Sequence, residues 1–276
     1  MIHLFPKLKN RTLLICACYI ALVGVYVALN KGTNMLFPII LAVVGLVIVV
    51  ISQLLTAFNV HSQLLAKLYN HMDAEGFLRE YEPKLALKLS NENVALMTRL
   101  HVSNAYCAQG RFDEAKKLLQ SVVIPKGKKQ EDELLSRFAI ASNLCYFSQL
   151  QEDLPAARAQ MNELLSLKKQ LEALQQSKPE KKRMVFNTEL NEQIMKYLET
   201  GKADIEALRN LVQGNSQQLH KVTISLWIAR AYLAENNRRE AVALLEKIVK
   251  LAPHLYPGKA AASILSGLPA KSNENE

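Results

Sequence analysis

The stretch NAYCAQGRFDEAKKLLQ, residues 104–120, contains the strongest structural pattern in this chain. Apolar residues recur with a helical period both before Gly110 and after Phe112, so the glycine marks a tight turn between two antiparallel helices. We expect Tyr106 to reach across to the second helix, and Ala115 is small where the two backbones must approach most closely. A hairpin of this size cannot bury its apolar face alone, so it must stack on further hairpins.

A second stretch, SLWIARAYLAENNRREAVALLEKIVKLAP at residues 225–253, carries the same pattern. Both stretches have a tyrosine, an alanine nine positions later and a leucine four positions after the alanine. Asn236 takes the turn position of Gly110, and Pro253 follows the second helix at the point where that helix must stop. The matching residues are Tyr106, Ala115 and Leu119 in the first stretch and Tyr232, Ala241 and Leu245 in the second.

These positions resemble the signature of the tetratricopeptide repeat (TPR), a helix-turn-helix unit of about 34 residues. The resemblance is clearest over residues 94–124 and 221–253, and residues 134–165 and 190–212 look like degenerate units of the same kind. Residues 61–89 are a candidate first divergent unit, and PGKAAASILSGL near the end is a candidate capping helix. The resemblance implies an all-α fold in which four or five hairpins stack into an α-solenoid.

Two uncharged apolar runs precede the repeats, one at residues 12–30 and the other within residues 32–63. Each is about as long as the 20 residues that a helix needs to cross a hydrocarbon core. A cleaved signal peptide is the alternative for the first run, but no small-x-small cleavage site closes it and a second run follows at once. We therefore expect a transmembrane helical hairpin at residues 1–58, a helical repeat domain at 59–268 and a disordered tail at 269–276.

The basic residues predict how this hairpin is oriented. Lys7, Lys9 and Arg11 precede the first run, whereas Lys31 alone lies between the two runs. The positive-inside rule then places both termini in the cytoplasm. We expect the membrane to be a bacterial plasma membrane. Neither run contains Asp, Glu, Lys or Arg, so a transport path would have no intramembrane ionisable group to use. The hairpin is therefore expected to be an anchor.

No arrangement of residues predicts catalysis. The chain has no zinc-protease motif, no phosphate-binding glycine loop and no nucleophile elbow, and its four cysteines lack zinc-ligand spacing. His71, Asp73 and Glu75 are close in sequence, but alternate residues do not share a helix face. We expect no enzymatic activity, no cofactor and no metal; a hidden enzyme would have to use residues that the sequence does not single out.

The formal charge of +9 raises the question of an anionic partner. Two basic clusters fall in expected loops, and the second lies in an insertion expected to be mobile at about residues 176–185. Solvated loops and contact with anionic lipid headgroups are both open readings. Nucleic-acid recognition is disfavoured because neither cluster is interleaved with stacking aromatic residues. The clusters are Lys126, Lys128 and Lys129, and then Lys178, Lys181, Lys182 and Arg183.

The family resemblance implies an adaptor whose first helices line a concave groove for a peptide or helix of a protein partner. On the register of the two tyrosines, the groove would include Asn104 and Cys107 in one unit and Leu226 and Arg230 in the other. Asn104 stands where chaperone-binding members have a clamp asparagine, but Leu100 replaces their lysine, so that clamp is not implied. The first hypothesis is a membrane scaffold. The alternative is a self-associating or lipid-surface-binding structural subunit of a membrane complex, without catalytic activity.

Overall fold

The computed structural model describes residues 4–29, 36–87, 89, 91–124, 130–174 and 178–269, which hold twelve α-helices and no β-strand. The expectation of an all-α chain is confirmed. The chain divides into unit 1, residues 1–65 with 86–90, and unit 2, residues 66–85 with 91–276. Helix α2 (Leu36–Tyr69) runs without a break through residue 58, where the anchor was expected to end, and through the division between the two units after residue 65.

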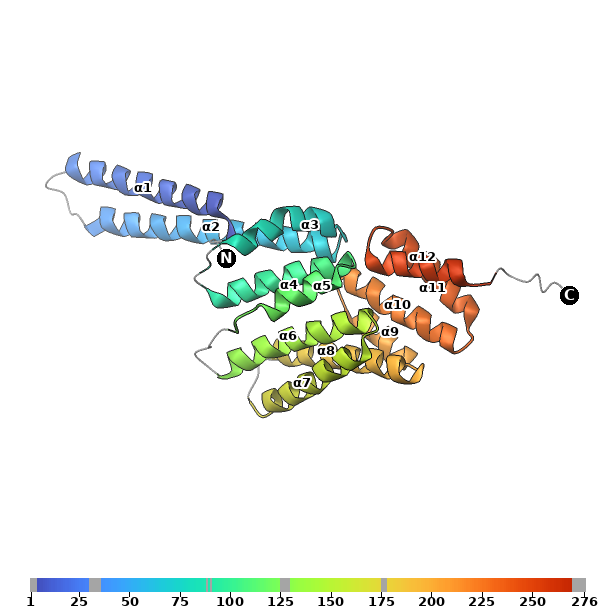
Figure 1. Ribbon diagram of the computed structural model, residues 1–276. Coiled ribbons are helices and arrows are strands. Elements are labelled where there is room, and N and C mark those ends of the chain that lie inside the picture. The colour runs from blue at the N-terminus through green and yellow to red at the C-terminus, as the bar shows by residue number, and fades with distance from the viewer. Residues whose placement is uncertain are drawn as a thin grey trace. The chain divides into compact units, whose positions relative to one another are not determined.

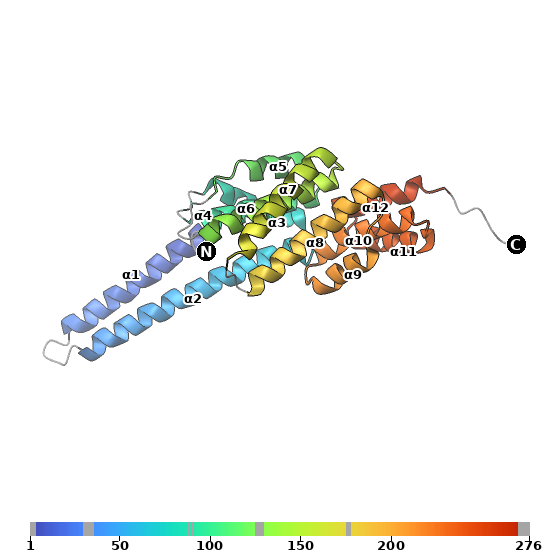
Figure 2. The same cartoon turned by 90° about the horizontal axis from the view of Figure 1, so that it is seen from below.

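Unit 1 is built on two long helices, α1 (Pro6–Leu29) and α2, which lie side by side in both views (Figures 1 and 2). Thr12 Oγ1 lies 3.5 Å from Gln53 Oε1, and the ring of Tyr19 covers Gly45, where a Cβ would collide with it. Because the two pairs step in opposite directions along the chain, the helices are antiparallel. Residues 6–29 and 42–69 are long and apolar enough to cross a membrane, and only 6% of each apolar window is buried.

Unit 2 consists of successive helical hairpins (Figure 1). The last turn of α2 is joined to α3 by the ion pair between Lys67 and Glu80. Four hairpins follow, formed by α4 with α5, α6 with α7, α8 with α9, and α10 with α11, and α12 ends the unit. The bounds are α3 Ala74–Tyr81, 3-10 helix η2 Glu82–Ala86, α4 Glu92–Ala108, α5 Phe112–Gln120, α6 Gln130–Leu150, α7 Leu154–Glu172, α8 Lys178–Thr200, α9 Ile205–Gly214, α10 Gln218–Ala234, α11 Arg238–Leu251 and α12 Tyr256–Gly267.

The turns inside the hairpins share one backbone conformation, although their sequences differ. Each turn has one residue in the left-handed region, with φ between 56° and 83°. Glycine reaches this region without strain, and asparagine reaches it more readily than most residues. In chain order the residues are Met72, Gly110, Glu152, Gly201 and Asn236. The five turns therefore share this backbone conformation, although their side chains at this position differ.

Aspartates begin several of the second helices. Asp73 accepts a hydrogen bond from the backbone N–H of Gly76, and Asp153 and Asp204 cap α7 and α9 in the same way. An Asp at this position satisfies one of the free N–H groups of the first turn. These caps fix the point at which each second helix starts.

One predicted loop is a helix. Residues 178–185, expected within a mobile insertion, form the first two turns of α8, and Lys181, Lys182 and Arg183 are exposed on it. They are helical because Met184 on the same turns is buried against α6 and α7. The side chain of Lys178 is outside the described part of the chain, as are the cluster Lys126, Lys128 and Lys129 and the tail beyond residue 269.

The hairpins pack consecutively, and the last helix also returns to the first complete hairpin. Helices α3, α5, α7, α9 and α11 each contact the next first helix in the chain, and α4 also contacts α6, which in turn contacts α8. Helix α12 packs on α10 and α11 as a cap would, but it contacts α4 as well. The face formed by the first helices is therefore closed by α12, and this closure shapes the candidate site.

Candidate functional site

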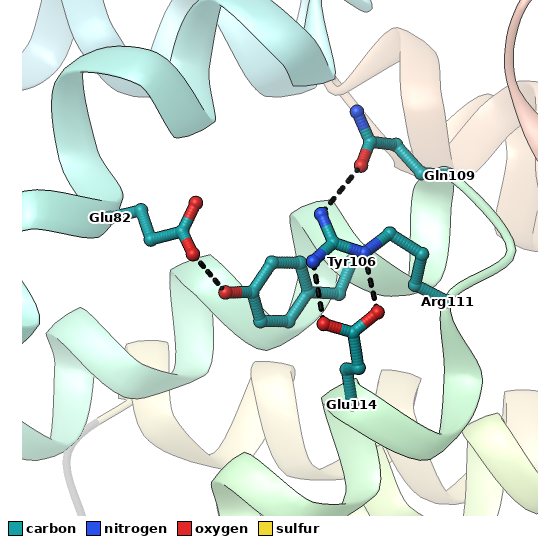
Figure 3. A network of polar contacts seen from close by, with 5 residues as sticks. All are labelled: Glu82, Tyr106, Gln109, Arg111 and Glu114. Carbon is teal, nitrogen blue, oxygen red and sulfur yellow. Dashed lines mark hydrogen bonds and ion pairs between the residues drawn. The ribbon is translucent and has the colours of Figure 1, made fainter.

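The tyrosine of the first repeat signature lies in a polar network that joins two hairpins (Figure 3). The Tyr106 hydroxyl donates a hydrogen bond of 2.6 Å to Glu82 Oε1, in the 3-10 helix after α3. Arg111 lies over the tyrosine ring, 4.2 Å from its centroid, and donates to both carboxylate oxygens of Glu114 at 2.7 and 2.6 Å. Burial and the bond to Glu82 raise the pKa of Tyr106 to about 12, so the hydroxyl stays a neutral donor.

The tyrosine of the second signature also binds the preceding hairpin, but its hydroxyl accepts a hydrogen bond instead of donating one. Arg209 of α9 donates to the Tyr232 hydroxyl, and its guanidinium lies 5.6 Å from the ring centroid. Both tyrosines therefore bind a charged residue of the preceding hairpin. The expectation that Tyr106 reaches its own second helix holds only for the ring, which meets Arg111 at the start of α5; the hydroxyl extends beyond the ring to the neighbouring unit.

The alanines and leucines of the two signatures pack the hairpins and are buried. Ala115 and Ala241 are fully buried where the two helices of a hairpin meet, and Leu119 and Leu245 are buried beside them. Pro253 is exposed two residues after the end of α11. A larger side chain at either alanine would separate the helices.

Asn104 and Cys107, two of the predicted groove residues, face the closed interior of unit 2. Asn104 Nδ2 donates to the hydroxyl of Tyr69 at 3.1 Å, and that hydroxyl lies 3.0 Å from His101 Nδ1. Tyr69 also meets the ring of His220 on α10 edge to face, 5.5 Å between centroids. Cys107 is buried. Both predicted residues therefore lie beneath contacts that the chain makes with itself.

Leu226 and Arg230, predicted to face the groove from α10, are also occupied. Leu226 has no exposed surface, so its expected contact with a partner is wrong for this structure. Arg230 Nη1 donates to Glu152 Oε1 at 2.9 Å, and the guanidinium lies 4.7 Å from the ring centroid of Trp227. The register predicted an open row of residues, whereas here α10 is covered by neighbouring hairpins and Arg230 is held by the turn between α6 and α7.

A small pocket lies between α4, α6, α10 and α12, and we call the surface that lines it the inner face. The pocket has a volume of about 30 Å³, room for about one water molecule. Its remaining space is limited because the start of α12 fills it. The lining residues are Asn104, Cys107 and Ala108 of α4, Tyr146 and Leu150 of α6, Leu219, His220 and Thr223 of α10, and Tyr256 and Pro257 of α12.

Tyr256 holds the start of α12 in place through three contacts. Its hydroxyl donates to the backbone carbonyl of Leu150 at 3.0 Å, and its ring meets Phe112 edge to face at 4.8 Å. The ring also lies on the side of Gly110, since a Cβ at that position would be 3.5 Å from Tyr256 Cδ2. Sequence reasoning singled out neither Tyr256 nor its neighbour Pro257. The proline at the start of a helix marks where α12 begins, but no local pattern predicts where that helix docks.

The electrostatics of the inner face favour neutral groups. Burial raises the pKa of the Tyr146 hydroxyl and of the Cys107 thiol well above their ordinary values, and burial lowers the pKa of His220 to about 4. A protonated thiol is a poor nucleophile and a poor metal ligand. The pocket is therefore lined by neutral hydrogen-bonding groups and apolar side chains.

Asp73 and Glu75, which are close to His71 in the sequence, have structural roles. Asp73 caps α3, and Glu75 pairs with Arg79 one turn later at 3.5 Å. Within the described residues, no group of three or more His, Cys, Asp and Glu side chains could hold a metal ion.

Comparison with known families identifies one of the hairpins. The family model of the tetratricopeptide repeat matches residues 225–254, which cover most of α10 and all of α11. No curated protein and no solved structure matches this chain. The chain is thus an all-helical protein with a TPR-type repeat, and repeats of this family are typically protein-interaction modules.

Proposed function

We propose that this chain is a membrane-anchored scaffold and that the inner face of unit 2 binds a segment of a protein partner. Helical repeats suit this task because their successive helices present one continuous surface to an extended chain or a helix. The polar and apolar side chains on the inner face would provide both orientation and burial for such a segment.

The observation that carries the proposal is that the inner face already holds a peptide segment, the Tyr256–Pro257 pair of α12. This segment contacts residues from three different hairpins and donates one hydrogen bond to a backbone carbonyl. Asn104 and Cys107, predicted to touch a partner, line the pocket beside it. A partner segment with an aromatic residue followed by proline would make equivalent contacts after the start of α12 has moved away.

The anchor is supported by the surface of unit 1. Among the described residues, eighteen of the twenty-three exposed large apolar side chains belong to α1 and α2. A contiguous apolar surface of this kind is unfavourable in water and favourable in a hydrocarbon layer. With Lys7, Lys9 and Arg11 in the first two turns of α1, both termini and unit 2 would face the cytoplasm.

In-cell photocrosslinking of the full-length chain tests the proposal. A photoreactive amino acid replaces Asn104 on the inner face, and the matched control carries it at the exposed Glu206 of α9. We expect one membrane-dependent protein adduct from position 104 and none of the same mass from position 206.

Two results would contradict the proposal. Adducts of equal yield from both positions would show that the inner face is not selective. Crosslinks from position 104 that remain confined to the chain itself, in every growth condition in which the protein is made, would leave α12 as a permanent cap.

A further inference from the structure

The ends of α7 and α8 form a separate exposed feature of unit 2, which we call the tip surface. Leu167 and Leu171 of α7 and Met184 of α8 belong to one buried cluster, so the last turns of α7 lie beside the first turns of α8 (Figure 2). The tip surface is defined by the side chains next to this cluster that point outward: Leu165, Lys168 and Lys169 of α7, and Lys181, Lys182, Arg183 and Val185 of α8.

Two large apolar side chains are exposed on the tip surface although the buried cluster lies directly beneath them. Val185 is 54% exposed and Leu165 is 38% exposed. In the described part of unit 2 the other large apolar side chains this exposed are Met97, Val123 and Leu251. A single exposed aliphatic residue needs no explanation. Here, however, two of them accompany a dense group of cations.

Several cations elsewhere in unit 2 form ion pairs with carboxylates. Arg111, Arg137, Arg158 and Arg230 each have a carboxylate partner. By contrast, none of the five cations on the tip surface takes part in an ion pair within the described residues, and two carboxylates, Glu172 and Glu180, lie on the same turns. The net charge of the tip surface with these two carboxylates is therefore positive.

We propose that the tip surface binds the anionic headgroups of a phospholipid bilayer. Lysine and arginine at a bilayer surface attract phosphate groups, and aliphatic side chains between them enter the boundary of the acyl chains. The tip surface has exposed Val and Leu where a nucleic-acid site would need exposed aromatic rings for stacking. This inference does not depend on the inner face binding a partner, so the two can fail separately.

The test uses the full-length chain in phosphatidylcholine vesicles, with and without phosphatidylglycerol. Cys16 and Cys18 are first replaced by alanine, while the buried Cys107 and Cys145 stay in place. A polarity-sensitive fluorophore is attached at Val185→Cys, and spin-labelled lipid is the quencher. The matched control carries the fluorophore at the exposed Glu206→Cys of α9, and Ser166→Cys on α7 provides a second position that keeps Val185.

We expect quenching at positions 185 and 166, but not at 206, only in vesicles that contain phosphatidylglycerol. High salt should weaken it, because the charges are screened. Each cation at such a surface contributes roughly fivefold to binding. Replacing Lys181, Lys182 and Arg183 by glutamine should therefore reduce quenching strongly, whereas glutamine at Lys247 and Lys250 on α11 should not. Equal quenching at 185 and 206, or quenching independent of phosphatidylglycerol, would overturn the proposal.

Discussion

Tyr106 and Tyr232 show how one residue type joins neighbouring hairpins of different charge. A phenol hydroxyl can donate or accept, so Tyr106 donates to Glu82 while Tyr232 accepts from Arg209. The sequence predicts the position of both tyrosines but not their partners. Those partners lie in the preceding unit, in a register that depends on how the hairpins stack.

Removing the hydroxyl should weaken this junction without disturbing the packing of the ring. Tyr106→Phe is expected to lower the free energy of unfolding by about 1.5 kcal/mol, because a hydrogen bond to a charged group is lost. The buried Trp227 is the only tryptophan, so its fluorescence during urea titration in detergent reports the loss. A free energy of unfolding that is the same in Tyr106→Phe as in the unaltered chain would contradict the assignment.

The left-handed turns give a second prediction at this scale. Gly110→Ala should cost about 1 kcal/mol, because φ is +83° and an alanine there is strained. Gly201→Ala is a matched control that measures only the strain of the left-handed backbone, since φ is +69° and nothing lies within 4 Å of its Cβ position. Met72→Gly should act in the opposite direction and stabilise, partly offset by the entropy of glycine. The midpoints of urea unfolding test this prediction. A midpoint for Gly110→Ala equal to that of the unaltered chain would contradict it.

His220 gives a prediction about pH. Its folded pKa of about 4 lies below the ordinary 6.5, so between these values the unfolded chain binds more protons and stability falls as pH falls. The free energy of unfolding should be lower at pH 5 than at pH 8 by at most about 2 kcal/mol. His220→Gln should flatten this dependence, whereas the exposed His254→Gln should leave it unchanged. An unaltered pH profile in His220→Gln would contradict the assignment.

At the scale of elements, periodicity and turn residues predicted most of the helices, including the hairpin turns at Gly110, Gly201 and Asn236. The basic stretch that begins α8 was expected to be a loop, because it is dominated by charged residues and Met184 is a single apolar residue without a helical pattern around it. In the structure Met184 is buried and holds this stretch as a helix. The docking of α12 on α4 could not be predicted, since it depends on how far the stacked hairpins curve. Of the residues predicted to line a groove, Cys107 and Leu226 are buried, whereas Asn104 and Arg230 are half-buried on α4 and α10.

Gly258 provides a test of how α12 docks. A Cβ at this position would overlap the backbone carbonyl of Ala252, so Gly258→Ala should force α12 away from the end of α11. Hydrogen exchange is expected to lose protection in α12 while the other helices of unit 2 keep theirs. Gly267→Ala is the control, because nothing lies within 4 Å of its Cβ position. Retained protection of α12 in Gly258→Ala would contradict this packing.

At the scale of the whole molecule, the two units have different surfaces and different proposed tasks. Unit 1 exposes apolar side chains along both long helices, as a membrane anchor would. Unit 2 buries its signature residues and closes its inner face with its own last helix. A scaffold of this kind would release α12 when a partner segment binds. The affinity for the partner then depends on how much more favourable its binding free energy at the inner face is than that of α12.

The most direct measurement compares the yield of the Asn104 photocrosslink in cells that carry Tyr256→Ala, Tyr256→Phe or the unaltered Tyr256. Tyr256→Ala removes the ring that fills the inner face, whereas Tyr256→Phe removes only the hydrogen bond to Leu150. If the partner and α12 compete, capture of the partner should rise severalfold in Tyr256→Ala and only slightly in Tyr256→Phe. Equal capture by all three chains, at equal protein levels, would contradict a shared site.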